Sequence, residues 1–484
     1  MEETGKLGIW RLTAIVFGSV IGASIFNIAE NMAHGAAAGA AMLAWTLTGI
    51  GILFLVLTFR GLSTLHPELR AGIYQYAQVG FGDYAGFNMA WGYWICVVLG
   101  NVTYAVLLND SVGAFVPIFN QHGWPTFLLG TLLIWLMYYL VTRGIQSASY
   151  INTLMSILKF GCILLILGIL AIFFRIRVFT SDFWGNVTLP GISIGSQVSS
   201  CMLVTIWSFL GIEGAVNMSA RAKHHSDVGK ATMTGFLLAL LLYVLVTALC
   251  FGIMSQPEIA ALPNPSLAYA LEYCVGSWAK WFVVGSIIIS VTGGFIAWSL
   301  LCAQTPYEAA MEKVFPSVFL KVNRHGVPAF GMRVASVVMT LCLLLVITAE
   351  NVYLAAVNLA SMMILPCYFF CGLYLLKITL CRATEGIRRH RVSLIVISSA
   401  TIVYCGYSMY AGSLWLLMLT LIFYLAGTPF MLLARRENRK RGMHGCGEGT
   451  PLMSGGEKTA LAMLVIFAVV SVWLLVTGKI ALDG

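Results

Sequence analysis

The chain has 484 residues, of which 59% are hydrophobic and only 10% are charged, and its formal net charge is +9. Soluble globular domains carry about 25% charged residues, so the composition excludes a soluble globular protein and indicates a membrane protein. The positive charge does not indicate nucleic-acid binding, because the basic residues are distributed among alternate loops between apolar segments.

Apolar segments long enough to cross a bilayer, about 20 residues each, recur along the whole chain. They predict an all-α polytopic membrane protein. We predict thirteen spans, near residues 9–30, 37–59, 84–116, 124–142, 149–173, 195–219, 230–254, 275–304, 329–348, 352–376, 392–410, 413–433 and 459–477. The loops rich in Lys and Arg all fall on one side of these spans, which predicts a cytoplasmic N-terminus and places the tail after Lys479 on the outer face.

The first span is interrupted by Gly22-Ala23-Ser24. Backbone N–H groups freed at such a break start a half-helix whose positive dipole end suits a carboxylate. The carbonyls that end the preceding half-helix suit an ammonium group. The geometry fits an α-amino acid, and the alternative is a packing patch of small residues between helices.

The sixth span contains a second interruption, Trp207-Ser208-Phe209-Leu210-Gly211-Ile212-Glu213. A carboxylate at membrane depth is costly, so Glu213 is a candidate functional residue. Broken helices at matching places in two halves of a chain are typical of the binding site of a secondary transporter. This pairing favours the binding-site interpretation of Gly22-Ala23-Ser24 over helix packing.

The two breaks predict two five-helix repeats, the second inverted relative to the first. The predicted organisation is 1–175 for the first repeat, 195–377 for the second, 391–434 for helices 11–12, 435–458 for a basic, Gly-rich cytoplasmic linker, and 459–484 for a thirteenth helix with a short outer tail.

Aromatic residues recur at the depth of the breaks: Tyr93, Trp94, Tyr104, Trp207, Phe209 and Trp298. An aromatic face stabilises a cation by roughly 0.5–2 kcal/mol, so this group could hold a guanidinium or amine. Packing in the core or against lipid is the alternative. Asn101, beside Gly100, is either a hydrogen-bonding residue between helices or a substrate contact.

Lys159 and Glu213 are the two ionisable residues deep in predicted spans. If they pair, both can be structural; if they do not, each is a candidate for proton coupling. An enzyme would gather His, Cys or paired acids at membrane depth, whereas all eight histidines lie in or near loops. We therefore expect no enzyme activity, no cofactor and no metal. An amino-acid-gated sensor or channel is a further alternative, although a sensor would usually carry a sizeable soluble domain.

The residues of both breaks, together with Tyr93-Trp94, Gly100-Asn101 and Trp298 with Gln304, resemble the amino acid–polyamine–organocation superfamily, and within it the basic amino acid/polyamine antiporters. The resemblance covers spans one to twelve. The thirteenth span and the segment from Arg221 to Thr232 resemble the arginine/ornithine and arginine/agmatine exchangers.

The resemblance implies a bacterial inner-membrane antiporter that exchanges external L-arginine for agmatine, with ornithine as the second candidate and lysine/cadaverine exchange as the third. A homodimer is left open. The implied substrate-binding residues are Val20, Gly22, Ala23, Ser24, Cys96, Val97, Asn101, Tyr104, Trp207, Leu210, Trp298 and Leu359.

Within that set, the resemblance places the substrate carboxylate at Ala23 and Ser24, the amino group at the backbone of Val20 and Trp207, and the guanidinium on Trp298. It implies gating by Tyr74, Tyr93, Trp207 and Cys367, and proton coupling by Glu213 and Lys159. Lys159 matches a lysine that replaces a sodium ion in proton-linked relatives.

The sequence departs from the arginine/agmatine pattern at five of these positions. Ala23 replaces a hydroxyl residue, Val97 a Cys, Tyr104 a Met, Cys367 a Tyr and Leu359 a Ser.

Overall fold

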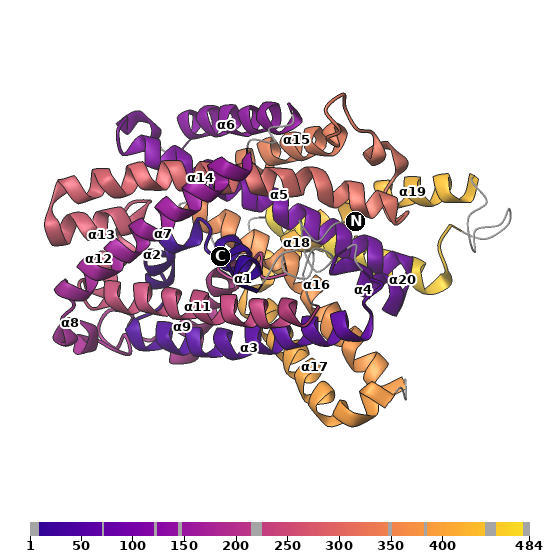
Figure 1. Ribbon diagram of the computed structural model, residues 1–484, viewed down its shortest axis with the longest axis horizontal. Coiled ribbons are helices and arrows are strands. Elements are labelled where there is room, and N and C mark those ends of the chain that lie inside the picture. Colours follow the sequence, from indigo (N-terminus) through magenta and orange to yellow (C-terminus); the bar gives the residue numbers. More distant parts are fainter. Residues whose placement is uncertain are drawn as a thin grey trace.

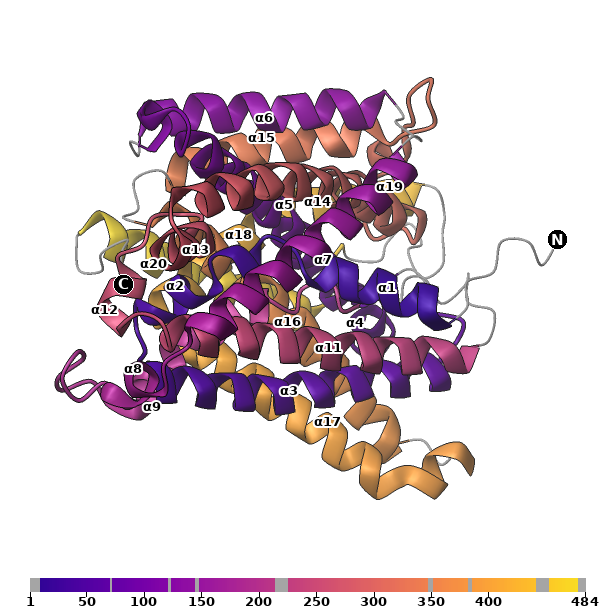
Figure 2. The same ribbon diagram turned by 60° about the vertical axis from the view of Figure 1, so that its left-hand side comes forward.

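The computed structural model describes residues 9–69, 72–120, 123–143, 148–213, 225–346, 351–381, 385–440 and 452–477. All regular secondary structure in these ranges is helical. Figures 1 and 2 show long helices packed side by side, with α6 alongside α15 on one side of the bundle and α3 alongside α11 on the other.

Within the described ranges, nine helices are long and apolar enough to cross a membrane. They comprise α3 (Ala38–Leu65), α5 (Asp83–Gly113), α6 (Trp124–Thr142), α11 (His225–Phe251), α14 (Ser277–Met311), α16 (Val352–Cys381), α17 (Glu385–Ala411), the α18–α19 segment (Leu414–Ala426 and Thr428–Lys440) and α20 (Gly455–Val476). Three apolar segments are shorter, in α7 (Ala148–Phe173), α9 (Ile194–Trp207) and α15 (Ala329–Val346).

Short helices connect or cap the long ones: α4 (Tyr74–Phe81), α8 (Ile176–Ser181), α12 (Gln256–Ala260), α13 (Ser266–Val275) and the 3-10 turns η3 (Pro117–Asn120) and η5 (Ser317–Leu320). The nine long helices, the three shorter apolar helices and the broken first helix together place a helix in each of the thirteen predicted spans. The all-helical polytopic fold is therefore as predicted, whereas the inverted relation of the two repeats stays a prediction.

The first span is broken where the sequence predicts. Helix α1 (Ile9–Val20) ends before Gly22, a 3-10 turn η2 (Ser24–Phe26) follows, and α2 (Ile28–Ala33) begins a second half-helix. Helix α9 likewise ends at Trp207, and turns continue to Glu213 through Gly211, whose φ of +99° favours glycine. The rest of span six and Arg221 lie outside the described residues.

The centre and the periphery of the bundle differ in burial. Every residue of the most apolar stretch of α5 is buried, against 11% of that stretch in α20. Helix α5 is thus the central helix, in contact with α14 and α16. Helix α20 exposes apolar side chains such as Val469 and Trp473, as a lipid-facing helix does.

The thirteenth helix is joined to α19 by an ion pair. The Arg435 guanidinium contacts both oxygens of Glu457, at 2.6 and 2.8 Å, and also donates to the Leu452 carbonyl at 2.6 Å. This bidentate contact holds the two ends of the predicted linker together. Residues 441–451 of that linker, and the outer tail from 478 onwards, lie outside the described part of the chain.

Candidate functional site

The carbonyls that end α1 are held by side chains from two other helices. Lys159, on α7, donates from Nζ to the carbonyl of Ile21 and, at 3.4 Å, to that of Gly18. Tyr243, on α11, donates to the Val20 carbonyl at 2.9 Å, and its hydroxyl lies 2.8 Å from Ser24 Oγ. The break is therefore fixed by buried polar contacts, as irregular backbone at membrane depth requires.

Tyr104 brings α5 against this break. The Tyr104 hydroxyl faces the backbone N–H of Ala23. A Cβ at Gly22 would lie only 2.8 Å from that hydroxyl oxygen, and one at Gly294 would lie 2.9 Å from the Tyr104 ring. Glycine at both positions allows this close approach.

The Tyr104 ring also belongs to an aromatic cluster with Trp207 and Trp298. Ring centroids are 5.8 Å apart for Tyr104 and Trp298 and 5.7 Å apart for Trp207 and Trp298. A Cβ at Gly100 would lie 2.5 Å from the Trp298 ring, so α5 accepts this indole only because residue 100 has no side chain. We call Tyr104, Trp207 and Trp298 the aromatic cluster.

The other aromatic residues predicted at this depth lie in separate groups, which corrects the expectation of one group. Trp94 packs on Trp91, with centroids 5.2 Å apart, and Phe209 lies against Tyr243 at 5.9 Å. Tyr93 is associated with Glu213. Tyr93 and Trp94 share α5 with Tyr104 but lie about 15 Å from it along the helix, from a rise of about 1.5 Å per residue. Residues of one helix also face different neighbours around its axis.

Asn101 joins α5 to α14. Its Nδ2 donates to the Val97 carbonyl at 2.8 Å and contacts Cys302 Sγ at 3.3 Å, while its Oδ1 accepts from the Ser299 hydroxyl at 3.0 Å. Of the two interpretations of this residue, the structure shows the hydrogen bond between helices. Contact with a substrate stays a prediction, as it does for Cys96 and Val97, which are buried on the same helix.

Glu213 is 4% exposed and accepts two hydrogen bonds. The Tyr368 hydroxyl donates at 3.0 Å and the Gly211 N–H at 3.2 Å, and the Tyr93 hydroxyl lies nearby. Sequence reasoning missed Tyr368, because a tyrosine within an apolar helix carries no signal of its partner. It missed Tyr243 for the same reason. The gating role that the resemblance implies for Cys367, the neighbour of Tyr368, stays a prediction.

Glu213 and Lys159 do not pair. The structure shows four ion pairs among the residues it describes, and neither residue takes part in any of them. Each side chain instead hydrogen-bonds the backbone of a different break. Glu213 does so in the turn after α9, and Lys159 at the end of α1. The paired, purely structural alternative is therefore excluded for this structure.

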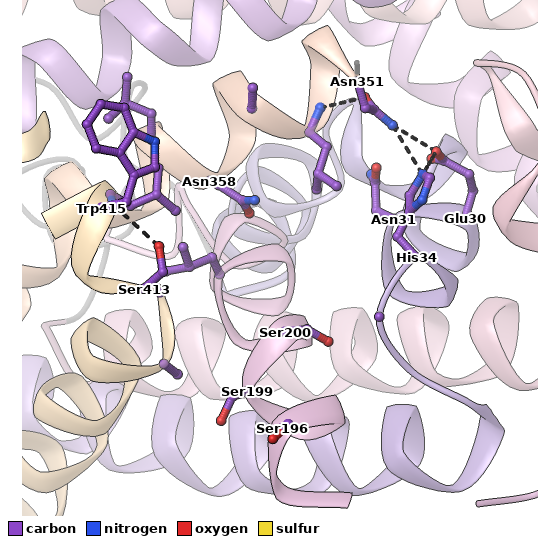
Figure 3. A pocket seen from close by; sticks show the side chains of 18 of the residues that line it. Glu30, Asn31, His34, Ser196, Ser199, Ser200, Asn351, Asn358, Ser413 and Trp415 are labelled. Atoms are coloured by element: carbon purple, nitrogen blue, oxygen red, sulfur yellow. Dashed lines mark hydrogen bonds and ion pairs between the residues drawn. The ribbon is translucent and has the colours of Figure 1, made fainter. Parts of the chain in front are cut away.

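A cavity of about 1610 Å³ lies beside α2 and the start of α9, at the end of the bundle away from Glu213. Its walls include the start of α9, where Figure 3 shows Ser196, Ser199 and Ser200, and the start of α16, where it shows Asn358. The end of α5 and Leu359 also line it. Asp110 in this cavity and Tyr93 beside Glu213 lie about 25 Å apart along α5, from a rise of about 1.5 Å per residue. Near the other end, Tyr74 is buried, and so is Leu210 in the turn after α9.

These features define a multi-pass membrane transporter: broken helices at the centre of an apolar bundle, with a cavity lined by α2 and the start of α9 at one end. Residues 7–442 match the family described as amino acid permease, and the chain belongs to this family within the amino acid–polyamine–organocation superfamily. Members of the family are transporters and not enzymes.

Two relatives resemble the chain over most of its length. An arginine/ornithine antiporter from Pseudomonas aeruginosa is 38% identical over 489 residues, with 99% of each chain covered. An arginine/agmatine antiporter from Chlamydia trachomatis serovar D is 40% identical over 434 residues, covering 89% of this chain and 90% of the relative. A solved structure of a Na⁺-coupled sialic acid symporter has a TM-score of 0.51 at 14% identity, covering 85% of this chain and 90% of the symporter, and supports the fold alone.

Proposed function

We propose that the protein is an antiporter that exchanges external L-arginine for internal agmatine by alternating access, with its N-terminus in the cytoplasm. The observation that carries the proposal is the position of Tyr104, whose hydroxyl contacts the break at Ala23 and whose ring contacts Trp298. One ligand could thus present an α-amino acid end to the broken helix and a guanidinium to the aromatic cluster. Relatives named as antiporters of arginine with agmatine or ornithine support the substrate class.

Agmatine is preferred to ornithine as the counter-substrate because arginine and agmatine share the guanidinium that the aromatic cluster would bind. Ornithine is the second candidate, favoured by the relative that is similar over 99% of both chains. Counterflow distinguishes them. Proteoliposomes loaded with agmatine, ornithine or cadaverine are given labelled arginine, and we expect the fastest uptake with agmatine inside. Faster uptake with ornithine inside would make the protein an arginine/ornithine exchanger.

We also expect uptake to require a substrate inside the vesicle and to be indifferent to sodium. The reason is Lys159, whose ammonium supplies a fixed positive charge to the carbonyls at the end of α1. The measurement is arginine uptake into empty and agmatine-loaded vesicles, each with and without a sodium gradient. Rapid uptake into empty vesicles driven by sodium alone would contradict both the exchange mechanism and this role of Lys159.

Glu213 is proposed to couple exchange to protons through the inner gate that it forms with Tyr93 and Tyr368. Protonation would remove the negative charge that both hydroxyls face, and so would change which end of the site is open. We expect the rate of arginine counterflow to vary with pH between about pH 4 and 7. Glu213→Gln should flatten this profile and leave arginine binding largely intact.

The matched control is Glu312→Gln, which removes an exposed carboxylate from the residue that follows α14. It should keep the wild-type pH profile. If Glu213→Gln also keeps that profile, the carboxylate is structural. If Glu213→Gln abolishes binding, the side chain belongs to the substrate site.

A further inference from the structure

The cavity beside α2 and the start of α9 has two carboxylates in its walls. Glu30 on α2 and Asp110 on α5 both line it, at 2% and 8% exposure. Among the described residues of its lining there is no lysine or arginine, and His34 is the one basic side chain. Even with His34 paired to Glu30, the lining holds more acidic than basic side chains, so the cavity favours a positively charged ligand.

Hydrogen bonds hold the Glu30 carboxylate in place but use only one of its oxygens. Oε1 accepts from His34 Nε2 at 2.7 Å and from Asn351 Nδ2 at 2.9 Å, and Figure 3 shows these three side chains pointing toward one another. Oε2 is buried and has no hydrogen-bond partner in the described part of the chain. Because buried polar atoms are normally hydrogen-bonded, this free carboxylate oxygen could accept a hydrogen bond from a ligand.

Three further acceptor atoms in the cavity walls are also buried without a hydrogen-bond donor. The Oδ1 atoms of Asn31, Asn264 and Asn358 are buried, and no described residue donates to them. Asp110 accepts from Asn109 Nδ2 at 3.3 Å, and the Asn264 side chain lies close to it. Every unsatisfied side-chain atom named here is an acceptor, whereas guanidinium and ammonium groups carry only donors.

We propose that this cavity is a second binding site, which holds the guanidinium or ammonium group of a cationic amine between Glu30 and Asp110 before it reaches the aromatic cluster. A metal ion is disfavoured, because no group of three or more His, Cys, Asp or Glu side chains that could hold one occurs among the described residues. The proposal rests on the proposed function for the direction of travel, but the binding itself can be measured without transport.

The test uses a reporter cysteine in the cavity wall. Ser200 on α9 is exposed and lines the cavity, so Ser200→Cys should react with a membrane-impermeant methanethiosulfonate reagent. The rate is measured on the reconstituted protein, with the same protein lacking the new cysteine as background. We expect agmatine to slow the reaction. Glu30→Gln and Asp110→Asn, each made separately, should raise the agmatine concentration needed for protection at least tenfold.

Controls separate this site from the central one. Glu30→Gln keeps Oε1 as the acceptor for His34 and Asn351, and gel filtration checks that each variant is folded. Glu258→Gln, in α12 and outside the cavity lining, should leave protection unchanged. Trp298→Ala should also leave it unchanged, because the aromatic cluster is a different site.

Protection that is lost in Trp298→Ala but unaltered in Glu30→Gln and Asp110→Asn would overturn the proposal. Equal protection by sodium or calcium chloride would replace it with an inorganic cation site. Counterflow without any protection would refute the second site alone. Protection without counterflow would refute the antiporter and leave the second site standing.

Discussion

Lys159→Met is expected to reduce arginine counterflow about a hundredfold. The ammonium is 9% exposed and donates to the carbonyls of Ile21 and Gly18, which the break leaves without helical partners. Hydrogen bonds to charged groups contribute about 1.5–3 kcal/mol each, so losing two costs about 3 kcal/mol or more. Each ~1.4 kcal/mol corresponds to a tenfold change. Methionine has a similar length, so the loss reflects the missing donors more than a cavity.

The measurement is the initial rate of labelled arginine uptake into agmatine-loaded proteoliposomes with equal amounts of inserted protein. Lys321→Met removes an exposed lysine and serves as the control, with an expected rate near that of the wild type. A normal rate in Lys159→Met would show that the end of α1 does not need the ammonium. It would also remove the physical basis for expecting sodium independence.

Trp298→Ala is expected to weaken the binding of arginine and agmatine alike, by about five- to thirtyfold. Both ligands carry the same guanidinium, and loss of one cation–π contact costs about 1–2 kcal/mol. Trp298→Phe should retain part of the affinity, because an aromatic face remains. Equilibrium binding of both labelled ligands to the purified protein gives the two ratios.

Trp278→Ala is the matched control, because Trp278 lies on the same helix but is 60% exposed. It should bind both ligands as the wild type does. Normal binding by Trp298→Ala would assign this indole to packing against Gly100 and Trp207. Loss of arginine binding alone would place the ring at the carboxylate end of the ligand.

The two helix breaks were predictable from local sequence because their causes are local. Gly22 and Gly211 interrupt otherwise apolar segments, and the helices end close to both. The positions of the spans were predictable for a similar reason, since crossing a bilayer requires a continuous apolar segment whatever its neighbours are. Glu213 was identifiable because a carboxylate in such a segment is costly.

The partners of these residues were decided by tertiary structure. Tyr368 reaches Glu213 across 155 positions, and Tyr243 reaches Ser24 across 219. Both tyrosines lie in apolar segments, and the residues around them in the sequence indicate only core packing. Nothing in one helix specifies which face of another it will meet.

Asn101, Glu213 and Lys159 show what the packing of helices adds. Sequence alone left Asn101 between two roles and left the pairing of Glu213 with Lys159 open. Packing of α14 on α5 supplied Ser299 to Asn101, and packing of α7 near α1 gave Lys159 the carbonyls of the break instead of a carboxylate. A polar group buried in an apolar bundle must find a partner, and the sequence predicts that need. Only the arrangement of the helices decides which partner satisfies it.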